Sequence, residues 1–388
     1  MNTPRHGVYT VGESTRGKSK TRKIIPLPNR EYLTEDVVLL PELFKKNGYI
    51  TANFGKWHVS EKPLTQGVDF NVAGGINGNP GKNGYFSPYE VPHISNGPEG
   101  EYLTDRLTTE AITFIEQNRD TSFFVYLPLY AVHTPLLPNP DLYESKYRNA
   151  DKYLRNSQRK YAAMVETLDQ NIGRLIDYID EMGLAKNTII ILTSDNGGIA
   201  SISPQTPARA GKGSYFQGGL RVPLMIRWQG VTTPQNNDQL TVNLDFFATF
   251  CEMFNLDIDQ PKDGISLLSI ILGERQLVQQ NRFLYFHFPI YLQSYDGARD
   301  EARDPLFRTR PGAVIISQDW SLHEYFEDNE KLLFNLTEDV GEQKDVAKTY
   351  PEVVEQLYDR LSEWREAIGA PVPKALNEDY DEFFSDRQ

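Results

Sequence analysis

The chain has 388 residues, a hydrophobic content of 39% and a formal net charge of −13. This composition is ordinary for a globular protein, and the length exceeds the size at which a single core usually stops growing, so we expect two domains. The negative charge argues against a general nucleic-acid binder, whose partner is a dense anion. It does not exclude a local positive pocket for a small anion.

Cysteine usage and apolar runs exclude two further classes of protein. Cys251 is the only cysteine, so the fold has no intrachain disulfide. It stands in an apolar run, which predicts a buried, inert thiol. No stretch approaches the roughly 18 consecutive apolar residues of a membrane helix, and the first residues lack the apolar region of a secretory signal. If the natural start lies upstream, the absence of a signal says nothing about the compartment.

Helical and strand patterns alternate along the first 275 residues. Residues 1–35 are polar and predict a loop. The predicted helices are 39–44, which Gly48 stops, 103–117 and 161–182, and the predicted strands are 49–54, 122–129, 188–193 and 222–228. Apolar strands buried on both faces and separated by helices predict an α/β fold with a mostly parallel central sheet and helices on both faces. In such folds ligands bind beyond the carboxyl ends of the strands.

The pattern changes after about residue 275. A smaller antiparallel sheet and a closing helix are predicted from short apolar strands at 283–288, 313–316, 321–326 and 331–335 and a helical stripe over 352–368. We therefore expect an α/β domain over residues 1–275 and a C-terminal subdomain over residues 276–388. The acidic tail from Pro371 is expected to be loose or draped over the surface.

Polar clusters follow the first two of these strands. Lys56 and His58 come directly after strand 49–54, and on an extended segment both point to the same side, where both can donate to an anionic oxygen. The alternative is a solvated loop with a capping histidine. His133 follows strand 122–129 and suits proton transfer or anion binding near neutral pH. The alternative is a structural histidine beside a proline turn.

Two more clusters flank the last two strands. Asp195 and Asn196 follow strand 188–193, and their carboxylate and amide oxygens suit Ca²⁺ or Mg²⁺ rather than zinc. The alternative is an Asx-turn that ends the strand. Lys212 lies between glycines that permit close approach of a ligand, without the spacing of a phosphate-binding P-loop. The alternative is a flexible basic loop. Together the four clusters favour an anionic ester, phosphate or sulfate, as substrate.

The order of these motifs resembles the type I sulfatases, arylsulfatase-like enzymes of the alkaline phosphatase superfamily. The series is G-K-W-H at 55–58, H-T-P at 133–135, S-D-N-G-G at 194–198 and G-K-G-x-x-x-x-G-G-x-R-V-P at 211–223. The stretch 320–344 also resembles the final sheet of that family. The resemblance implies a hydrolase that cleaves a sulfate monoester at a calcium-centred site.

The resemblance assigns a role to each site residue. It implies that Asp195 and Asn196 ligate Ca²⁺, with Mg²⁺ as the alternative. It implies that Lys56 and His58 hold the nucleophile and a sulfate oxygen.

The remaining roles concern the leaving group. His133 binds sulfate or assists at the leaving oxygen, and Lys212 stabilises the departing alcohol, if the chain follows the family. His287 either lines the substrate side or is structural, and both interpretations stay open.

The chain departs from the family in one respect. The family's nucleophile is a formylglycine made from Cys or Ser in a C/S-x-P-x-R motif, and no such motif occurs in the sequence. Cys251 does not qualify, and residues 205–209 imitate the motif with Gln in first place. We expect the chain as printed to lack the nucleophile and the family's pair of metal-binding aspartates, to be a fragment, and to be inactive alone. We also expect the central sheet to have an exposed edge.

Three functions therefore stand as hypotheses. The first is a sulfuric ester hydrolase acting on a sugar or polysaccharide. The second is a phosphodiesterase or phosphonate hydrolase of the same superfamily, and the third is a non-catalytic binder of sulfated glycans. The resemblance implies a periplasmic or secreted location, while the substrate's identity and the oligomeric state stay open.

Overall fold

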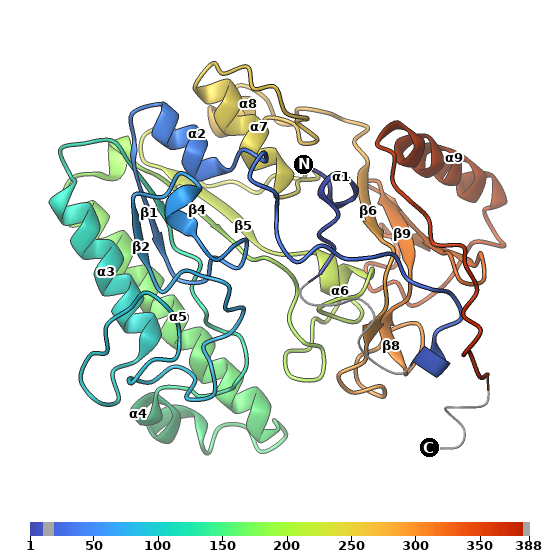
Figure 1. Ribbon diagram of the computed structural model, residues 1–388, viewed down its shortest axis with the longest axis horizontal. Coiled ribbons are helices and arrows are strands. Elements are labelled where there is room, and N and C mark those ends of the chain that lie inside the picture. Colours follow the sequence, from blue (N-terminus) through green and yellow to red (C-terminus); the bar gives the residue numbers. More distant parts are fainter. Residues whose placement is uncertain (11–18, 383–388) are drawn as a thin grey trace. The chain divides into compact units, whose positions relative to one another are not determined.

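The computed structural model describes residues 1–10 and 19–382, which form two compact units (Figure 1). Unit 1 consists of Met1–Glu31, Ile191–Ile226 and Val231–Gln388, and unit 2 of Tyr32–Ile190 and Arg227–Gly230. Residues 11–18 of the predicted N-terminal loop and the last six residues of the tail lie outside the described residues. This division does not test the domain boundary at residue 275, which stays a prediction.

The centre of unit 2 is a parallel sheet of three strands. The order is β2 (Phe70–Val72), β1 (Ile50–Phe54) and β3 (Phe123–Tyr126), and Ala52 is in register with Phe70 on one side and Val125 on the other. The parallel sheet predicted from the sequence is thus confirmed, although the short strand β2 was not predicted. Parallel strands bring their carboxyl ends to one edge, where the polar clusters were expected.

Helices cover both faces of this sheet, as predicted. On one face, α3 (Leu103–Gln117) packs Ala111, Phe114 and Ile115 against Ala52 and Phe54 of β1. On the other face lies α2 (Leu40–Lys46).

Phe44 of α2 stacks on Phe124 of β3, with ring centroids 4.2 Å apart. Side chains of a strand alternate between its faces, so Phe124 and its neighbours contact different helices. The long helix α5 (Asn156–Glu181) lies beside α3, and Asn171 Nδ2 donates to Asp105 Oδ1 at 2.6 Å. It begins before the predicted position because Gln158 caps its first turn by accepting from the Arg155 amide at 2.9 Å.

Short elements complete unit 2. They are η2 (Pro63–Thr65), α4 (Pro140–Leu142), the π-helical turn η3 (Tyr143–Tyr147) and η4 (Ala185–Asn187). A second core beneath the long connections contains the buried side chains of Tyr85, Tyr102, Leu107, Tyr130 and Met164.

Strands β4 (Ile189–Thr193) and β5 (Leu224–Trp228) pair with each other in a two-stranded sheet. The prediction that β3, β4 and β5 are fully buried was wrong, because their side chains are half-buried or exposed. Met225 of β5, for example, is 56% exposed. Within the described ranges, β3 and β4 each pair with one strand, whereas β1, which is flanked on both sides, is buried from Thr51 to Phe54.

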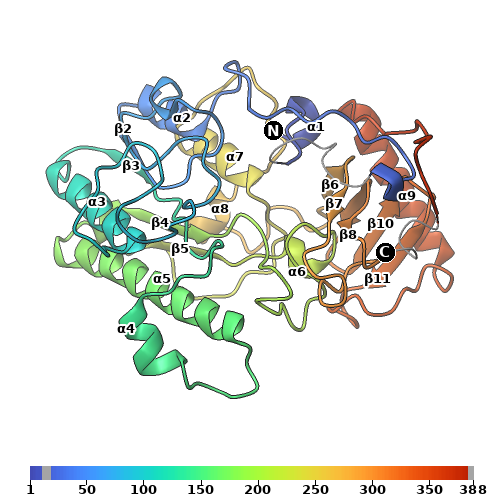
Figure 2. The same cartoon turned by 60° about the horizontal axis from the view of Figure 1, so that its bottom comes forward.

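The C-terminal part of unit 1 is the predicted antiparallel sheet with its closing helix. The strand order is β11 (Lys331–Asn335), β10 (Trp320–Tyr325), β9 (Gly312–Ile316) and β6 (Leu284–Phe288). Figure 2 shows α9 (Pro351–Ala367) beside this sheet. Its Leu357 and Leu361 pack against Ile315, Leu322 and Leu333 in one core.

The remaining elements of unit 1 are short. They are α1 (Thr3–His6), η1 (Ser19–Thr21), α6 (Gln217–Leu220), α7 (Leu244–Met253), α8 (Leu268–Ile271) and the antiparallel pair β7 (Leu292–Gln293) and β8 (Phe307–Thr309). Cys251 lies in α7 and is 2% exposed, so the predicted burial is confirmed, and that burial raises the pKa of its thiol.

The described part of the tail lies along the N-terminal segment of the same unit. Ile25 donates to the Ala375 carbonyl at 2.8 Å, and Asp381 donates to the Lys20 carbonyl at 2.9 Å. Up to residue 382 the tail is therefore draped over the fold and held there, rather than loose.

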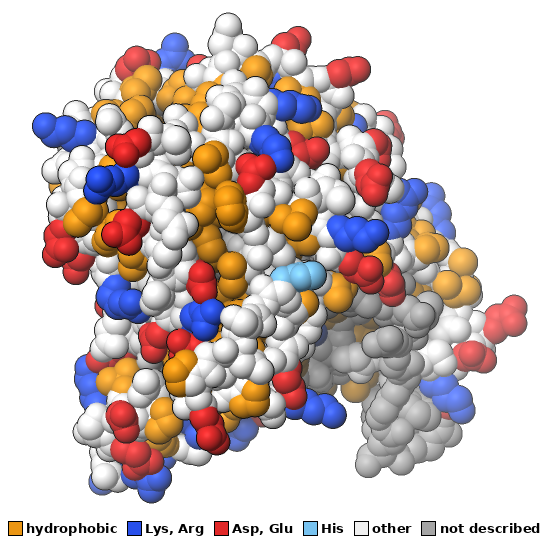
Figure 3. Space-filling model, turned by 60° about the vertical axis from the view of Figure 1, so that its left-hand side comes forward, with side chains coloured by type: hydrophobic (Ala, Val, Ile, Leu, Met, Phe, Trp, Pro, Cys, Tyr) orange, Lys and Arg blue, Asp and Glu red, His pale blue; other side chains and the backbone are white. Residues whose placement is uncertain are grey.

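The surface seen in Figure 3 carries cationic and anionic side chains interspersed, without a large patch of one sign. Among the described residues, none of the helices combines the length and apolar character needed to cross a membrane.

Candidate active site

Lys56 and His58 lie in a tightly held turn at the carboxyl end of β1. A Cβ atom on Gly55, whose φ is 128°, would lie 2.3 Å from the Pro128 carbonyl oxygen, so only glycine fits there. The Lys56 amide donates to that same oxygen at 2.8 Å, and the His58 amide donates to Gly75 at 2.8 Å. His58 has a φ of 57°, so the segment is not extended there and strand alternation does not predict where its side chain points.

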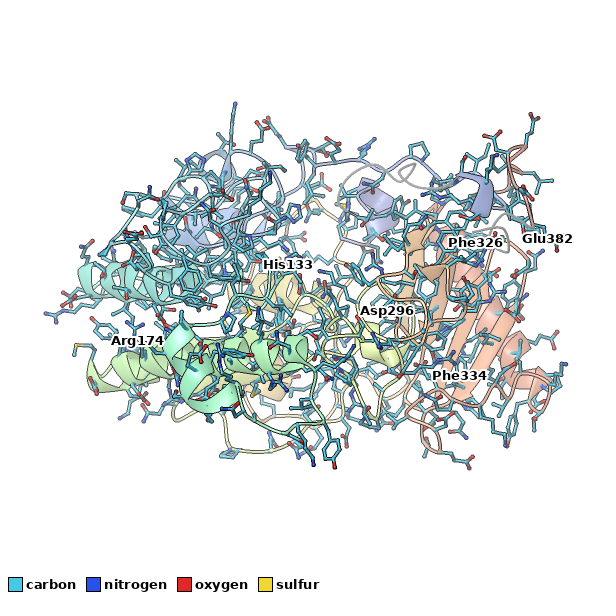
Figure 4. The ribbon with its side chains drawn as sticks, turned by 90° about the horizontal axis from the view of Figure 1, so that it is seen from below. His133, Arg174, Asp296, Phe326, Phe334 and Glu382 are labelled. Atoms are coloured by element: carbon cyan, nitrogen blue, oxygen red, sulfur yellow. The ribbon has the colours of Figure 1, made fainter. Side chains whose placement is uncertain are left out.

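His133 lies beyond the carboxyl end of β3 and is labelled in Figure 4. Its Nδ1 atom is 2.8 Å from the Thr134 carbonyl oxygen, which can only accept, so Nδ1 carries the proton of the neutral ring and Nε2 is the basic nitrogen. The hydroxyl of buried Tyr85 donates to the carbonyl oxygens of Tyr130 at 2.8 Å and His133 at 2.7 Å. This turn is therefore fixed from the core.

The two segments leave the same edge of one sheet. β1 and β3 are parallel neighbours, and the hydrogen bond from Lys56 to Pro128 joins the residues that follow them. Within unit 2 the structure thus brings the predicted anion-binding residues to the edge where the sequence predicted them.

Asp195 and Asn196 begin the loop after β4. Asn196 Nδ2 donates to the Gly197 carbonyl at 2.9 Å, which leaves Oδ1 as its oxygen donor for a cation. The Gly197 amide donates to Gly219 at 3.0 Å. A Cβ atom on Gly197 would lie 1.8 Å from the Gly218 carbonyl oxygen, so this glycine is required for the close approach of two backbones.

Lys212 lies directly against that loop in unit 1. Its amide donates to the Gly198 carbonyl at 2.8 Å, and the Ser214 amide donates to Gly211 at 3.1 Å. The segment is therefore bonded to the neighbouring loop and closed by a turn of its own, which argues against the alternative of a flexible basic loop. The structure joins the predicted cation ligands and the predicted lysine through one backbone hydrogen bond.

A buried network beneath α6 supports the Lys212 segment and was missed from the sequence. Glu342, fully buried, accepts from the Gln217 amide at 2.5 Å. Its backbone carbonyl accepts from Arg209 Nη1 at 3.2 Å, and the Arg209 guanidinium lies 4.2 Å from the Phe216 ring centroid. No local motif marks Glu342, because its partners are distant in sequence.

His287 has a structural position. It lies in β6, is 4% exposed, and its Nε2 donates to the Pro371 carbonyl oxygen at 2.8 Å. Desolvation lowers its pKa to about 4, and nearby Arg365 acts in the same direction, so the ring is neutral at pH 7. Of the two interpretations left open by the sequence, these contacts favour the structural one.

The donors at Asp195 and Asn196 fit a hard divalent cation in chemical type. Calcium takes about six to eight oxygen ligands, more than one carboxylate and one amide provide. Among residues 1–10 and 19–382, no group of three or more His, Cys, Asp or Glu side chains is placed to hold a metal ion. Asp195 and Asn196 would therefore supply part of a coordination shell.

An α/β fold in which a loop with hard oxygen donors adjoins a lysine loop suits the hydrolysis of an anionic ester. The sulfatase family model matches residues 4–256, and the model of the C-terminal region of N-sulphoglucosamine sulphohydrolase matches residues 211–367. The chain belongs to the sulfatase family, whose members are sulfuric ester hydrolases.

Curated relatives agree with this family. A sulfatase of Formosa agariphila is 32% identical over 95% of this chain and 77% of its own length. Human N-acetylgalactosamine-6-sulfatase is 31% identical over 72% of this chain, and the match spans 56% of the human protein.

Solved structures share the fold. Ps i-CgsB in complex with k-i-k-neocarrahexaose has a TM-score of 0.69 and 22% identity, over 97% of this chain and 81% of that chain. BT4656 in complex with its substrate D-glucosamine-2-N,6-O-disulfate has a TM-score of 0.67 and 18% identity, over 96% of this chain and 90% of that chain.

Proposed function

We propose that this protein hydrolyses a sulfate monoester on a sugar or polysaccharide at a calcium-centred site. The observation that carries the proposal is the hydrogen bond from the Lys212 amide to the Gly198 carbonyl, at 2.8 Å. It couples the loop with hard oxygen donors to the loop with a cationic side chain. Sulfate ester hydrolysis needs both, because charge develops on the transferred group and on the departing oxygen.

Each predicted residue has a role in this scheme. Asp195 and Asn196 would contribute to a shell around Ca²⁺, with Mg²⁺ as the alternative, and the cation would offset the charge of the sulfate group. Lys212 would stabilise the departing oxygen.

The residues of unit 2 complete the proposed set. Lys56 and His58 would donate to a sulfate oxygen and hold the nucleophile. His133, whose Nδ1 proton is held by the Thr134 carbonyl, would use Nε2 to bind sulfate or to pass a proton at the leaving oxygen.

The substrate class is proposed from relatives. The human relative is named for a sulfated amino sugar, and two structural neighbours are complexes with a carrahexaose and a disulfated glucosamine. A sulfated glycan is therefore the substrate we propose. By the same family resemblance we propose a periplasmic or secreted location, which fractionation of the source cells would contradict if the activity stayed in the cytoplasm.

The complete gene product, assayed on matched esters, tests the proposal. Because the printed sequence contains no C/S-x-P-x-R motif, the assay uses the protein as its source cells produce it. We expect sulfate release from sulfated sugars, loss of activity on chelation, and recovery with Ca²⁺. Faster cleavage of phosphate diesters or phosphonates would favour the superfamily's other hydrolases. Saturable glycan binding without turnover would favour a binding protein.

A further inference from the structure

Arg308 of β8 is held beside the Lys212 segment. Its Nε donates to the Gln293 carbonyl at 2.7 Å, and Nη1 donates to the Lys212 carbonyl at 3.2 Å. The guanidinium carbon lies 3.8 Å from the Tyr295 ring centroid. A Cβ atom on Gly213, whose φ is 85°, would lie 2.8 Å from Nη1, so this glycine makes room for the arginine.

The charge of Arg308 has no carboxylate partner within 4 Å in the part of the chain that the structure describes. Two other arginines of unit 1 that are withdrawn from water are paired: Arg282 with Asp245 at 2.6 Å, and Arg310 with Asp304 at 2.6 Å. Desolvation lowers the pKa of Arg308, in opposition to Tyr295 and Asp300. A guanidinium that is partly desolvated and bonded to uncharged carbonyls is suited to bind an anion from outside the protein.

Arg308 is a close neighbour of the Lys212 segment and of the turn after β7, where Lys212, Ser214, Tyr295 and Asp300 surround it. The carboxylate of Asp300 is committed to the turn after β7, where its Oδ2 accepts from the amides of Tyr295 at 2.6 Å and Asp296 at 3.1 Å. Asp296 is labelled in Figure 4 and belongs to this turn. One oxygen of the neighbouring carboxylate is therefore bonded to backbone amides, and the guanidinium of Arg308 is held next to the Lys212 segment.

We propose that Arg308, stacked on Tyr295, is a specificity-determining residue that binds a second anionic group on the sugar whose sulfate ester is cleaved. This inference rests on the proposed function, in which Lys212 lies at the departing oxygen. An anion held by Arg308 would then sit on the leaving-group side of the ester. A uronic-acid carboxylate and a second sulfate share the chemistry that a planar guanidinium recognises.

The test compares substrates that differ in one anionic group, with the complete gene product. The substrates are a sulfated disaccharide with a uronic acid, its carboxyl-reduced form, a disulfated sugar, its monosulfated form, and 4-nitrophenyl sulfate. The variants are Arg308→Ala, Arg308→Gln and the control Arg299→Ala. Arg299 lies in the same connection, with a side chain that is 58% exposed and paired to Asp296.

We expect Arg308→Ala and Arg308→Gln to lower kcat/KM on the order of 10- to 100-fold for substrates with the second anion, mainly through KM. The change for the counterparts that lack the second anion, and for 4-nitrophenyl sulfate, should be below about threefold. If the variants lose the difference in kcat/KM between the uronic-acid substrate and its carboxyl-reduced form, Arg308 binds the carboxylate. If they lose the difference between the disulfated and monosulfated sugars, it binds the second sulfate. An equal loss on every substrate would mean that Arg308 only positions Lys212, and would overturn the inference.

Direct binding separates this inference from the proposed function. If the wild-type protein turns over no sulfate ester, the proposed function fails, and the dissociation constants of the same sugars then decide about Arg308. Weaker binding by Arg308→Ala of the doubly anionic sugars alone supports the inference. Unchanged binding overturns it.

Discussion

Glu342 and His323 face each other in the interior of unit 1, with Oε1 and Nε2 3.3 Å apart and both side chains without exposed surface. The other carboxylate oxygen of Glu342 accepts from the Gln217 amide at 2.5 Å. One buried side chain thus joins β10 to α6, and α6 directly follows the segment that carries Lys212.

Replacing Glu342 should loosen that segment. We expect Glu342→Ala to lower the free energy of unfolding by about 2–4 kcal/mol, because it leaves a buried amide and a buried imidazole without their acceptor. Glu342→Gln retains a hydrogen-bond acceptor, so it should lower the free energy of unfolding by less than Glu342→Ala does. The exposed Glu338→Ala is the control and should stay within about 0.5 kcal/mol. Urea denaturation measures all three, and equal values for Glu342→Ala and the control would contradict this role.

A methyl group at Gly197 should disturb the loop that carries Asp195 and Asn196. Because its Cβ would lie 1.8 Å from the Gly218 carbonyl oxygen, we expect Gly197→Ala to destabilise the fold by about 1–3 kcal/mol and to reduce activity at least tenfold. The control is Gly173→Ala in α5, where an added Cβ atom would meet nothing within 4 Å. This control should raise the free energy of unfolding by about 0.5–1 kcal/mol, because alanine is more stable than glycine inside a helix. Full stability and activity in Gly197→Ala would show that the backbones can separate without consequence.

Loss of Lys212 should depend on the leaving group. With aryl sulfates of graded leaving-group pKa, we expect Lys212→Ala to slow poor leaving groups on the order of 100-fold and good ones less than about tenfold. The reason is that good leaving groups carry their own negative charge without help. Exposed Lys374→Ala serves as control. An equal loss of rate across the whole series would contradict the role of Lys212 at the departing oxygen.

His287 should contribute a measurable pH dependence of stability. Its pKa is about 4 in the folded protein against 6.5 in the unfolded chain, so between these values the unfolded state binds more protons and stability falls as the pH falls. The full effect between pH 6.5 and pH 4 is about 3 kcal/mol. In His287→Gln, which retains a donor to Pro371, this part of the decline should disappear. His6, whose pKa is also lowered to about 4, titrates equally in both proteins. Parallel stability curves for wild type and variant would contradict this prediction.

The sequence predicted those parts of the fold and site that depend on local pattern. Strand ends identify the positions of Lys56, His133 and Asp195, since each polar cluster follows an apolar run within a few residues. Helices α3 and α9 and the antiparallel sheet likewise follow from periodicity.

Features that depend on distant contacts were not predictable. Glu342 is 125 residues from Gln217, and Arg308 is 96 residues from Lys212, so no local spacing reveals either contact. The burial of β3, β4 and β5 was overestimated because apolar composition reports what a strand can bury, while the number of neighbouring strands decides what it does bury. Strand alternation does not fix the direction of the His58 side chain, because a positive φ interrupts the extended segment.

The calcium-centred site is the central claim, and Asp195 tests it most directly. The measurement is sulfate release from a sulfated sugar by the complete gene product, as wild type, Asp195→Ala and the exposed control Asp238→Ala, each titrated with Ca²⁺ after chelation. We predict that wild type and Asp238→Ala recover activity with Ca²⁺, and that Asp195→Ala recovers less than about one part in a thousand at any concentration. Wild-type rates in Asp195→Ala at the same Ca²⁺ concentration would contradict the account.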